Sequence, residues 1–307
     1  MVPSTAINAT VRRLPMIPPF SIGGYAMIDQ MRPGYHRGMR VREMVFAVVL
    51  LSVGLASAAP TDSSPTEVWL RGKAGKLQAW LWRPAGPGPF PAIVYNHGSE
   101  DQPVVGTEGQ IGKFFVAHGY AVLFPYRRGA GKSEGRYWET EVNKLPEAQQ
   151  EQGTIDRLVL ENDDVVTAIE WMRAQPWVVR DDITVGGCSF GGIETLFTAE
   201  RPVPGLRAAL DFAGASMAWD DNPLLRERLL RAVESARVPI FFLQAENDFN
   251  TAPSKILSEA MRAKKLPHRM RIFPHFGHDH MSGHAGFCMM GWDSWGDDVL
   301  DFLRKRR

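Results

Sequence analysis

Segments rich in β-branched and aromatic residues alternate with stretches of helical spacing along most of this chain. We expect an opening pair of strands within 66–82 and further strands at 92–96, 121–126, 183–187, 208–214, 240–245 and 269–273. Helical spacing occupies 109–118, 155–174, 191–199, 224–236, 253–264 and 293–305. An antiparallel pair followed by strand–helix alternation predicts an α/β fold, with a mainly parallel sheet covered by helices on both faces. Sites in such sheets form at the carboxyl ends of the strands.

Composition excludes several classes of protein. The chain has 307 residues, 44% of them hydrophobic, which is ample for a packed core and excludes a disordered chain. Its formal net charge of +1 offers no basic field for nucleic acid. Two cysteines cannot form a disulfide framework.

The first 58 residues differ in character from the rest. A basic run from Met39 is followed by the apolar stretch 45–55 and small residues at Ala56 and Ala58. This layout predicts a signal peptide at about 39–58, with export to the periplasm or medium; an uncleaved anchor is the alternative. Because 1–38 is proline-rich without clear periodicity, we expect translation to start at Met39 or Met31. The predicted domains are therefore 1–58, the extension with its signal, and 59–307, the catalytic domain.

The strand expected at 183–187 leads directly into the pattern G-x-S-x-G, from Gly187 to Gly191. In a strand–turn–helix context this pattern presents a serine on a sharp turn, and the helix that follows directs its N–H groups toward developing negative charge. Ser189 is therefore the predicted nucleophile.

A serine hydroxyl needs a base and a carboxylate that orients the base. Asp248 follows the strand at 240–245, and His278 follows the strand at 269–273. Both positions lie where the carboxyl ends of parallel strands meet, in the chain order serine, acid, histidine. The sequence therefore predicts the triad Ser189, Asp248 and His278.

Over about residues 66–305 the chain resembles the α/β-hydrolase superfamily, and within it dienelactone hydrolases and related serine esterases and peptidases. The resemblance rests on the G-x-S-x-G turn at 187–191, called the elbow below, and on the Asp248 and His278 loops. It also rests on the HGS of 97–99 and the YRRGAGKSEG of 126–135. It implies that the backbone N–H groups of Ser99 and Phe190 form the oxyanion hole. Dienelactone hydrolases proper use a cysteine where this chain has Ser189, which favours a general serine hydrolase.

Other residues near the predicted site have competing interpretations. Cys188 is expected to be a structural thiol rather than the nucleophile, and a bridge to Cys288 is the less favoured possibility. Glu246 is the alternative acid and His280 the alternative base. The histidines between His275 and His284 suggest a metal cluster at first, but a loop beside an active site is the favoured interpretation.

Arg127 and Arg128 follow the strand at 121–126, where they would hold a substrate carboxylate or, more commonly, form structural ion pairs. We expect no metal or other cofactor and no nucleic-acid partner. With no long insertion for a large lid, the predicted activity is hydrolysis of a small carboxylic ester or lactone through an acyl-enzyme. The alternatives are a peptidase acting on short peptides and a catalytically silent binding protein with this fold.

Overall fold

The computed structural model describes residues 64–103 and 105–305. The predicted extension and signal, 1–58, lie outside these residues. Within them, eight strands form a single sheet in the order β1-β2-β4-β3-β5-β6-β7-β8. β2 pairs antiparallel with β1 and with β4, and every neighbouring pair from β4 through β3 to β8 is parallel. This mainly parallel sheet with an antiparallel opening pair is the predicted α/β-hydrolase fold.

The strands fall where β-branched and aromatic residues were concentrated. They are β1 (Thr66–Gly72), β2 (Gly75–Trp82), β3 (Phe90–Asn96), β4 (Ala121–Pro125), β5 (Val178–Cys188), β6 (Leu206–Phe212), β7 (Ile240–Ala245) and β8 (His268–Phe273). The helices are α1 (Val105–Ala117), α2 (Trp138–Val142), α3 (Glu147–Arg173), α4 (Phe190–Glu200), α5 (Pro223–Glu234), α6 (Ala252–Ala263), α7 (Phe287–Met290) and α8 (Trp292–Arg304). A short π-helix, η1 (Ser282–Gly286), precedes α7.

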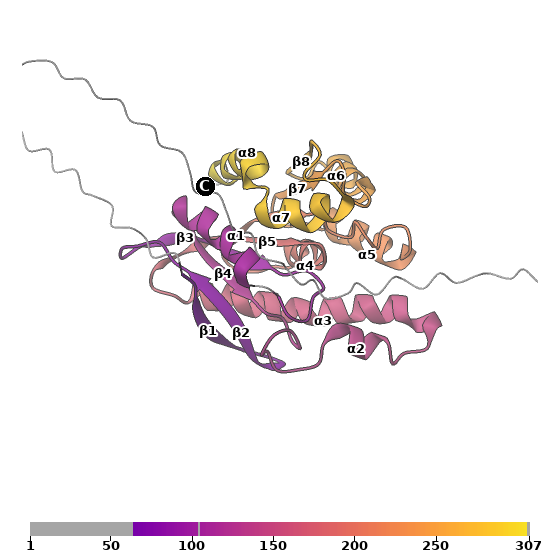
Figure 1. The fold of residues 1–307 in the computed structure, drawn as a ribbon, viewed down its shortest axis with the longest axis horizontal. Helices are drawn as coiled ribbons and strands as arrows, with labels where there is room; N and C mark the ends of the chain where they lie inside the picture. The colour runs from indigo at the N-terminus through magenta and orange to yellow at the C-terminus, as the bar shows by residue number, and fades with distance from the viewer. Residues whose placement is uncertain (1–63, 104, 306–307) are drawn as a thin grey trace, which may run out of the picture. The chain divides into compact units, whose positions relative to one another are not determined.

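Successive side chains of the central strands pack into two separate hydrophobic cores, one on each face of the sheet. On β3, Ala92 and Val94 pack into the core beneath α3, α4, α5 and α6, whereas Ile93 and Tyr95 pack into the core beneath α1, α7 and α8. Figure 1 shows α3 on one side of the sheet and α7 and α8 on the other. Because side chains alternate along a strand, burial of both faces requires the nearly continuous apolar runs that predicted these strands.

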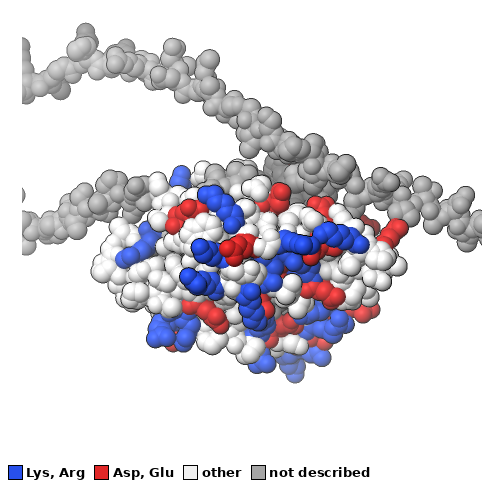
Figure 2. Space-filling view, turned by 90° about the horizontal axis from the view of Figure 1, so that it is seen from below, with Lys and Arg blue, Asp and Glu red and all other residues white. Residues whose placement is uncertain are grey.

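The connection at 136–154 contains α2 and the first turns of α3. No helix in the described ranges is long and apolar enough to span a membrane. On the face shown in Figure 2, Lys and Arg are interspersed with Asp and Glu. That face therefore presents no extended field of one sign.

Candidate active site

Ser189 lies between the end of β5 and the start of α4. Its φ of 58° and ψ of −115° place a non-glycine residue in a strained backbone region, as a sharp strand-to-helix turn requires. Gly191 allows the turn to pack closely, because a Cβ at this position would lie 2.3 Å from the Asn96 carbonyl oxygen. The strand–turn–helix geometry predicted for the elbow is therefore present, and it leaves Ser189 half-buried rather than enclosed.

Asp248 is a buried carboxylate in the loop after β7. Its Oδ1 accepts hydrogen bonds from the Ser216 hydroxyl at 2.6 Å, the Phe249 backbone N–H at 2.6 Å and His284 Nδ1 at 2.9 Å. Its Oδ2 accepts a hydrogen bond from Gln244 Nε2 at 2.8 Å. Because both oxygens are occupied by donors, the carboxylate is held in one orientation.

The histidine beside Asp248 is His284, and the predicted pairing with His278 was wrong. His278 is exposed in the loop after β8, and so is His280, whose Nδ1 contacts the Asn247 backbone carbonyl at 3.0 Å. His284 instead lies in η1, where it is buried. Gly283 allows η1 to approach the Asp248 loop, because a Cβ on Gly283 would lie 2.7 Å from the Asn247 side chain. His284, rather than His278, reaches Asp248 because η1 packs closely against the Asp248 loop.

His284 presents an unused nitrogen. Nδ1 points to the carboxylate, and the buried Nε2 has no hydrogen-bond partner among the described residues. A histidine that donates from Nδ1 carries its lone pair on Nε2, which is the protonation state a general base needs.

A disulfide joins the elbow to the histidine segment. Cys188, directly before Ser189, is bonded to Cys288, one helical turn after His284, with a Cα–Cα distance of 5.9 Å. The bridge that was the less favoured possibility is therefore present, and it excludes Cys188 as a nucleophile. Its two ends show that the Ser189 and His284 segments lie beside each other.

The two predicted oxyanion donors, Ser99 and Phe190, both contact Trp138. Trp138 Nε1 donates to the Ser99 carbonyl at 3.1 Å, and its ring packs against Phe190 at a centroid distance of 4.7 Å. The Tyr137 hydroxyl also donates to the Ser99 carbonyl. Burial raises the pKa of Tyr137 to about 12, so its hydroxyl remains a donor at neutral pH. Among the hydrogen bonds of the described residues outside helices and strands, none is donated by the Ser99 N–H, and Phe190 lies in the first turn of α4, where a backbone N–H has no carbonyl of its own helix to bond.

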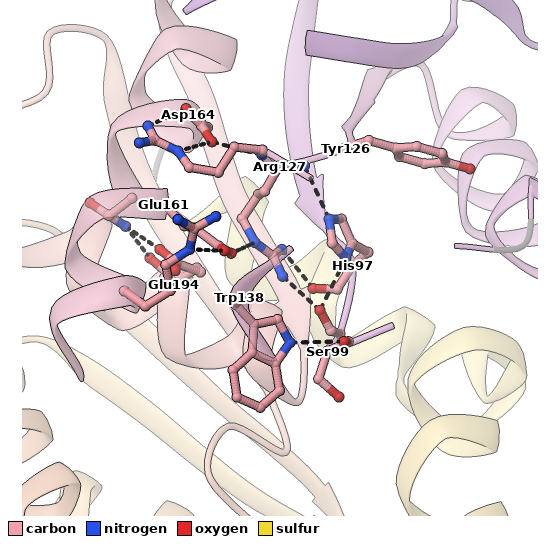
Figure 3. A network of polar contacts seen from close by, with 12 residues as sticks. His97, Ser99, Tyr126, Arg127, Trp138, Glu161, Asp164 and Glu194 are labelled. Carbon is pink, nitrogen blue, oxygen red and sulfur yellow. Dashed lines mark hydrogen bonds and ion pairs between the residues drawn. The ribbon is translucent and has the colours of Figure 1, made fainter. Parts of the chain in front are cut away.

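Both arginines after β4 form buried ion pairs with α3, and Figure 3 shows Arg127 near Glu161. Arg127 Nε donates to Glu161 Oε2 at 3.0 Å, and Arg128 Nη2 donates to Asp164 Oδ1 at 2.6 Å. Each guanidinium is thus engaged within the protein, which supports the structural interpretation over binding of a substrate carboxylate.

The remaining candidates lie apart from this arrangement. Glu246 is exposed and lies 3.6 Å from His275, so it does not take the place of Asp248. In the ranges described, no three His, Cys, Asp or Glu side chains gather as a metal site would require. An open hollow of about 400 Å³ lies among α3, α4 and α5 and contains none of the predicted site residues.

Comparison with known proteins places this geometry in a family. Residues 73–270 match the X-Pro dipeptidyl-peptidase (S15) family. A search of curated proteins gives no match. Among solved structures, the acylaminoacyl peptidase of Pyrococcus horikoshii is 18% identical with a TM-score of 0.57, over 79% of this chain and 41% of that one. The chain therefore matches less than half the length of that peptidase.

Two other similar structures are matched over most of their own length. An esterase of Pyrococcus furiosus is 16% identical with a TM-score of 0.57, over 79% of this chain and 91% of that one. A Klebsiella pneumoniae protein assigned as a dienelactone hydrolase is 14% identical with a TM-score of 0.55, over 78% of this chain and 96% of that one. These likenesses show the fold. With the family match spanning most of the chain, this protein belongs to the X-Pro dipeptidyl-peptidase (S15) family, within the α/β-hydrolase superfamily.

Proposed function

We propose that Ser189, His284 and Asp248 form a catalytic triad that hydrolyses small carboxylic esters or lactones. The observation that carries this proposal is the buried Asp248–His284 pair, joined at 2.9 Å, in which His284 Nε2 has no partner among the described residues. The segment that holds His284 is linked to the elbow by the disulfide. The role originally predicted for His278 passes to His284, because His278 lies exposed without a bond to the carboxylate.

In the proposed reaction, Ser189 Oγ attacks the carbonyl carbon while its proton moves to His284 Nε2. The negative charge on the former carbonyl oxygen is stabilised by the N–H groups of Ser99 and Phe190. The bond to the leaving oxygen then breaks, and the leaving group takes the proton from His284. Water, deprotonated by His284, attacks the acyl-enzyme, and collapse of the second tetrahedral species releases the acid and restores Ser189.

Aromatic side chains around these groups support a small apolar substrate. Trp138 and Phe190 are half-buried and pack together, and Phe249, which is 41% exposed, lies edge-on to His284 at a centroid distance of 5.6 Å. Apolar side chains beside a few placed polar groups favour substrates with a short acyl or aromatic portion. The longest internal connection, from β4 to β5, is occupied largely by α2 and α3 rather than by a separate lid.

The family match favours a second candidate, the release of dipeptides from short peptides. The same triad serves both reactions, since amide and ester hydrolysis pass through the same acyl-enzyme. The two candidates differ only in the leaving group and in the groups that bind the rest of the substrate.

Kinetics on paired substrates test the proposal. We expect kcat/KM for p-nitrophenyl butyrate to exceed that for glycyl-prolyl p-nitroanilide by at least about ten-fold, equivalent to 1.4 kcal/mol in the barrier. Ser189→Ala should abolish both activities. Faster cleavage of the anilide would favour the peptidase. If the wild type hydrolyses neither substrate faster than Ser189→Ala does, the assignment as an enzyme is contradicted and a catalytically silent binding protein is favoured.

We also propose that the protein is exported. The Cys188–Cys288 disulfide supports this, because structural disulfides persist mainly in oxidising compartments. Cell fractionation with N-terminal sequencing tests it: a mature terminus near residue 59 is expected, and a cytoplasmic protein with its thiols reduced would contradict it.

A further inference from the structure

We infer that Arg127 is a positioning residue for the oxyanion hole, acting through the backbone of the turn that carries Ser99. Its Nη1 donates to the His97 carbonyl at 2.8 Å and its Nη2 to the Gly98 carbonyl at 2.6 Å (Figure 3). This inference rests on the proposed function, because the Ser99 N–H is an oxyanion donor only if Ser189 attacks a carbonyl group. Arg127 itself does not touch the substrate.

Because a peptide bond is planar, fixing the Gly98 carbonyl also fixes the Ser99 N–H. The Gly98 carbonyl and the Ser99 N–H belong to the same trans peptide, so they point in opposite directions. When Arg127 fixes the carbonyl on one side of the chain, the N–H is fixed on the other. Gly98 lies beside the elbow, because a Cβ there would lie 3.8 Å from the Cys188 carbonyl oxygen. The guanidinium thus holds the orientation of the Ser99 N–H next to the nucleophile.

His97 contributes to the same fixation. Its Nδ1 lies 3.0 Å from the Gly98 carbonyl oxygen, and its Nε2 accepts from the Arg127 backbone N–H at 3.1 Å. Burial, with the neighbouring Arg127 charge, lowers the pKa of His97 well below its ordinary value. The ring is therefore neutral, with one donating and one accepting nitrogen, as these two contacts require.

The guanidinium itself is locked in place. Arg127 is 1% exposed, its Nε is bonded to Glu161, and Arg157 holds the other oxygen of Glu161 at 3.0 Å. The fork therefore has no freedom to turn toward a substrate. The next peptide along the chain is also held, because Tyr137 and Trp138 donate to the Ser99 carbonyl oxygen. Ser99 is thus flanked by two fixed peptide planes, and Arg127 holds the one that contains its N–H.

Substitution of Arg127 tests this role. Arg127→Met removes the fork but leaves Glu161 paired with Arg157, which limits the cost to folding. Arg127→Lys keeps the charge but lacks the planar fork that reaches both carbonyls. We expect kcat on p-nitrophenyl butyrate to fall about 10–100-fold in both variants, less than the loss of a whole oxyanion donor. KM should change less than about three-fold, and the pH midpoint of kcat should not move, because the His284–Asp248 pair is untouched.

Binding of a trifluoromethyl ketone separates positioning from a general structural effect. This inhibitor adds to the serine and places an oxyanion in the hole, so its Ki should rise in parallel with the loss of kcat/KM. Arg128→Met is the matched control, because Arg128 is also a buried strand-end arginine, and it bonds Asp164 and neither carbonyl of the turn. It should lower stability while the Ki and kcat of the folded protein stay within about three-fold of the wild type.

Three results would overturn the inference. Unchanged kcat and Ki in folded Arg127→Lys would show that the fork does not position the hole. Equal losses in Arg128→Met would show a general packing effect. If neither Arg127 variant folds while Arg128→Met does, Arg127 is structural, and the specific role falls. A wild type without Ser189-dependent hydrolysis would instead overturn the proposed function, and this role with it.

Discussion

At the scale of single residues, the site depends on how firmly Asp248 is held. Four donors, from Ser216, Phe249, Gln244 and His284, converge on one buried carboxylate. Asp248→Asn keeps the shape of the side chain but replaces an acceptor with an amide that favours the wrong tautomer of His284. We therefore expect kcat to fall about 10³–10⁴-fold, with KM changed far less.

Steady-state kinetics of Asp248→Asn and Glu246→Gln check this prediction. Glu246 is the neighbouring carboxylate but is exposed on the same loop, so its substitution should leave kcat within about two-fold. If Glu246→Gln caused the larger loss, Asp248 would not be the orienting acid.

At the scale of elements, the Cys188–Cys288 disulfide fastens α7 to the end of β5. The bridge closes a loop of 100 residues, and a loop of that length stabilises the folded state by about 4–5 kcal/mol in the chain-entropy description. We expect the double variant Cys188→Ala, Cys288→Ala to lower the free energy of unfolding by about 3–5 kcal/mol, measured by urea titration.

A reducing agent supplies the comparison for this prediction. The wild type treated with a phosphine reductant should approach the stability of the double alanine variant, which itself should not respond to the reductant. Equal urea midpoints for oxidised wild type and double variant would show that the bridge contributes nothing to stability.

At the scale of the whole molecule, the strand–helix alternation was enough to predict the sheet, its two covered faces and the loops that carry Ser189 and Asp248. Two features depend on which segments pack together in three dimensions: the choice of His284, which was not predicted, and the disulfide, which was only the less favoured possibility. Four histidines fall within ten residues of sequence, and only the packing of Gly283 against Asn247 brings His284 to the carboxylate. The disulfide joins residues 100 apart, for which the sequence supplies no distance. The small residues around His284, Gly283 and Ala285, were the available signal for close packing.

Stability should also vary with pH through Glu194, a buried residue of α4. Burial raises its pKa from an ordinary 4.5 to about 8, with Glu161 and Asp164 adding to the effect while Arg127 and Asn162 oppose it. A raised carboxyl pKa means that the folded protein binds this proton more tightly than the unfolded chain. The contribution of Glu194 to the free energy of unfolding therefore falls as pH rises from about 4.5 to about 8.

Glu194→Gln removes this titration while keeping an oxygen that can accept from Asn162. We expect the stability of Glu194→Gln relative to the wild type to increase by at least about 1 kcal/mol between pH 5 and pH 9, since one pKa unit corresponds to about 1.4 kcal/mol. Urea titrations at both pH values measure it. A constant difference between the two proteins would show that Glu194 does not titrate in this range.

The assignment of the triad is tested by the rate of labelling with a fluorophosphonate probe, read by mass spectrometry of the modified peptide. The wild type should carry the label on Ser189, and Ser189→Ala should not be labelled. His284→Ala should label at least about 10³-fold more slowly, because the serine loses its base, whereas His278→Ala should label at the wild-type rate. Slow labelling of His278→Ala with rapid labelling of His284→Ala would contradict the triad and restore His278 as the base.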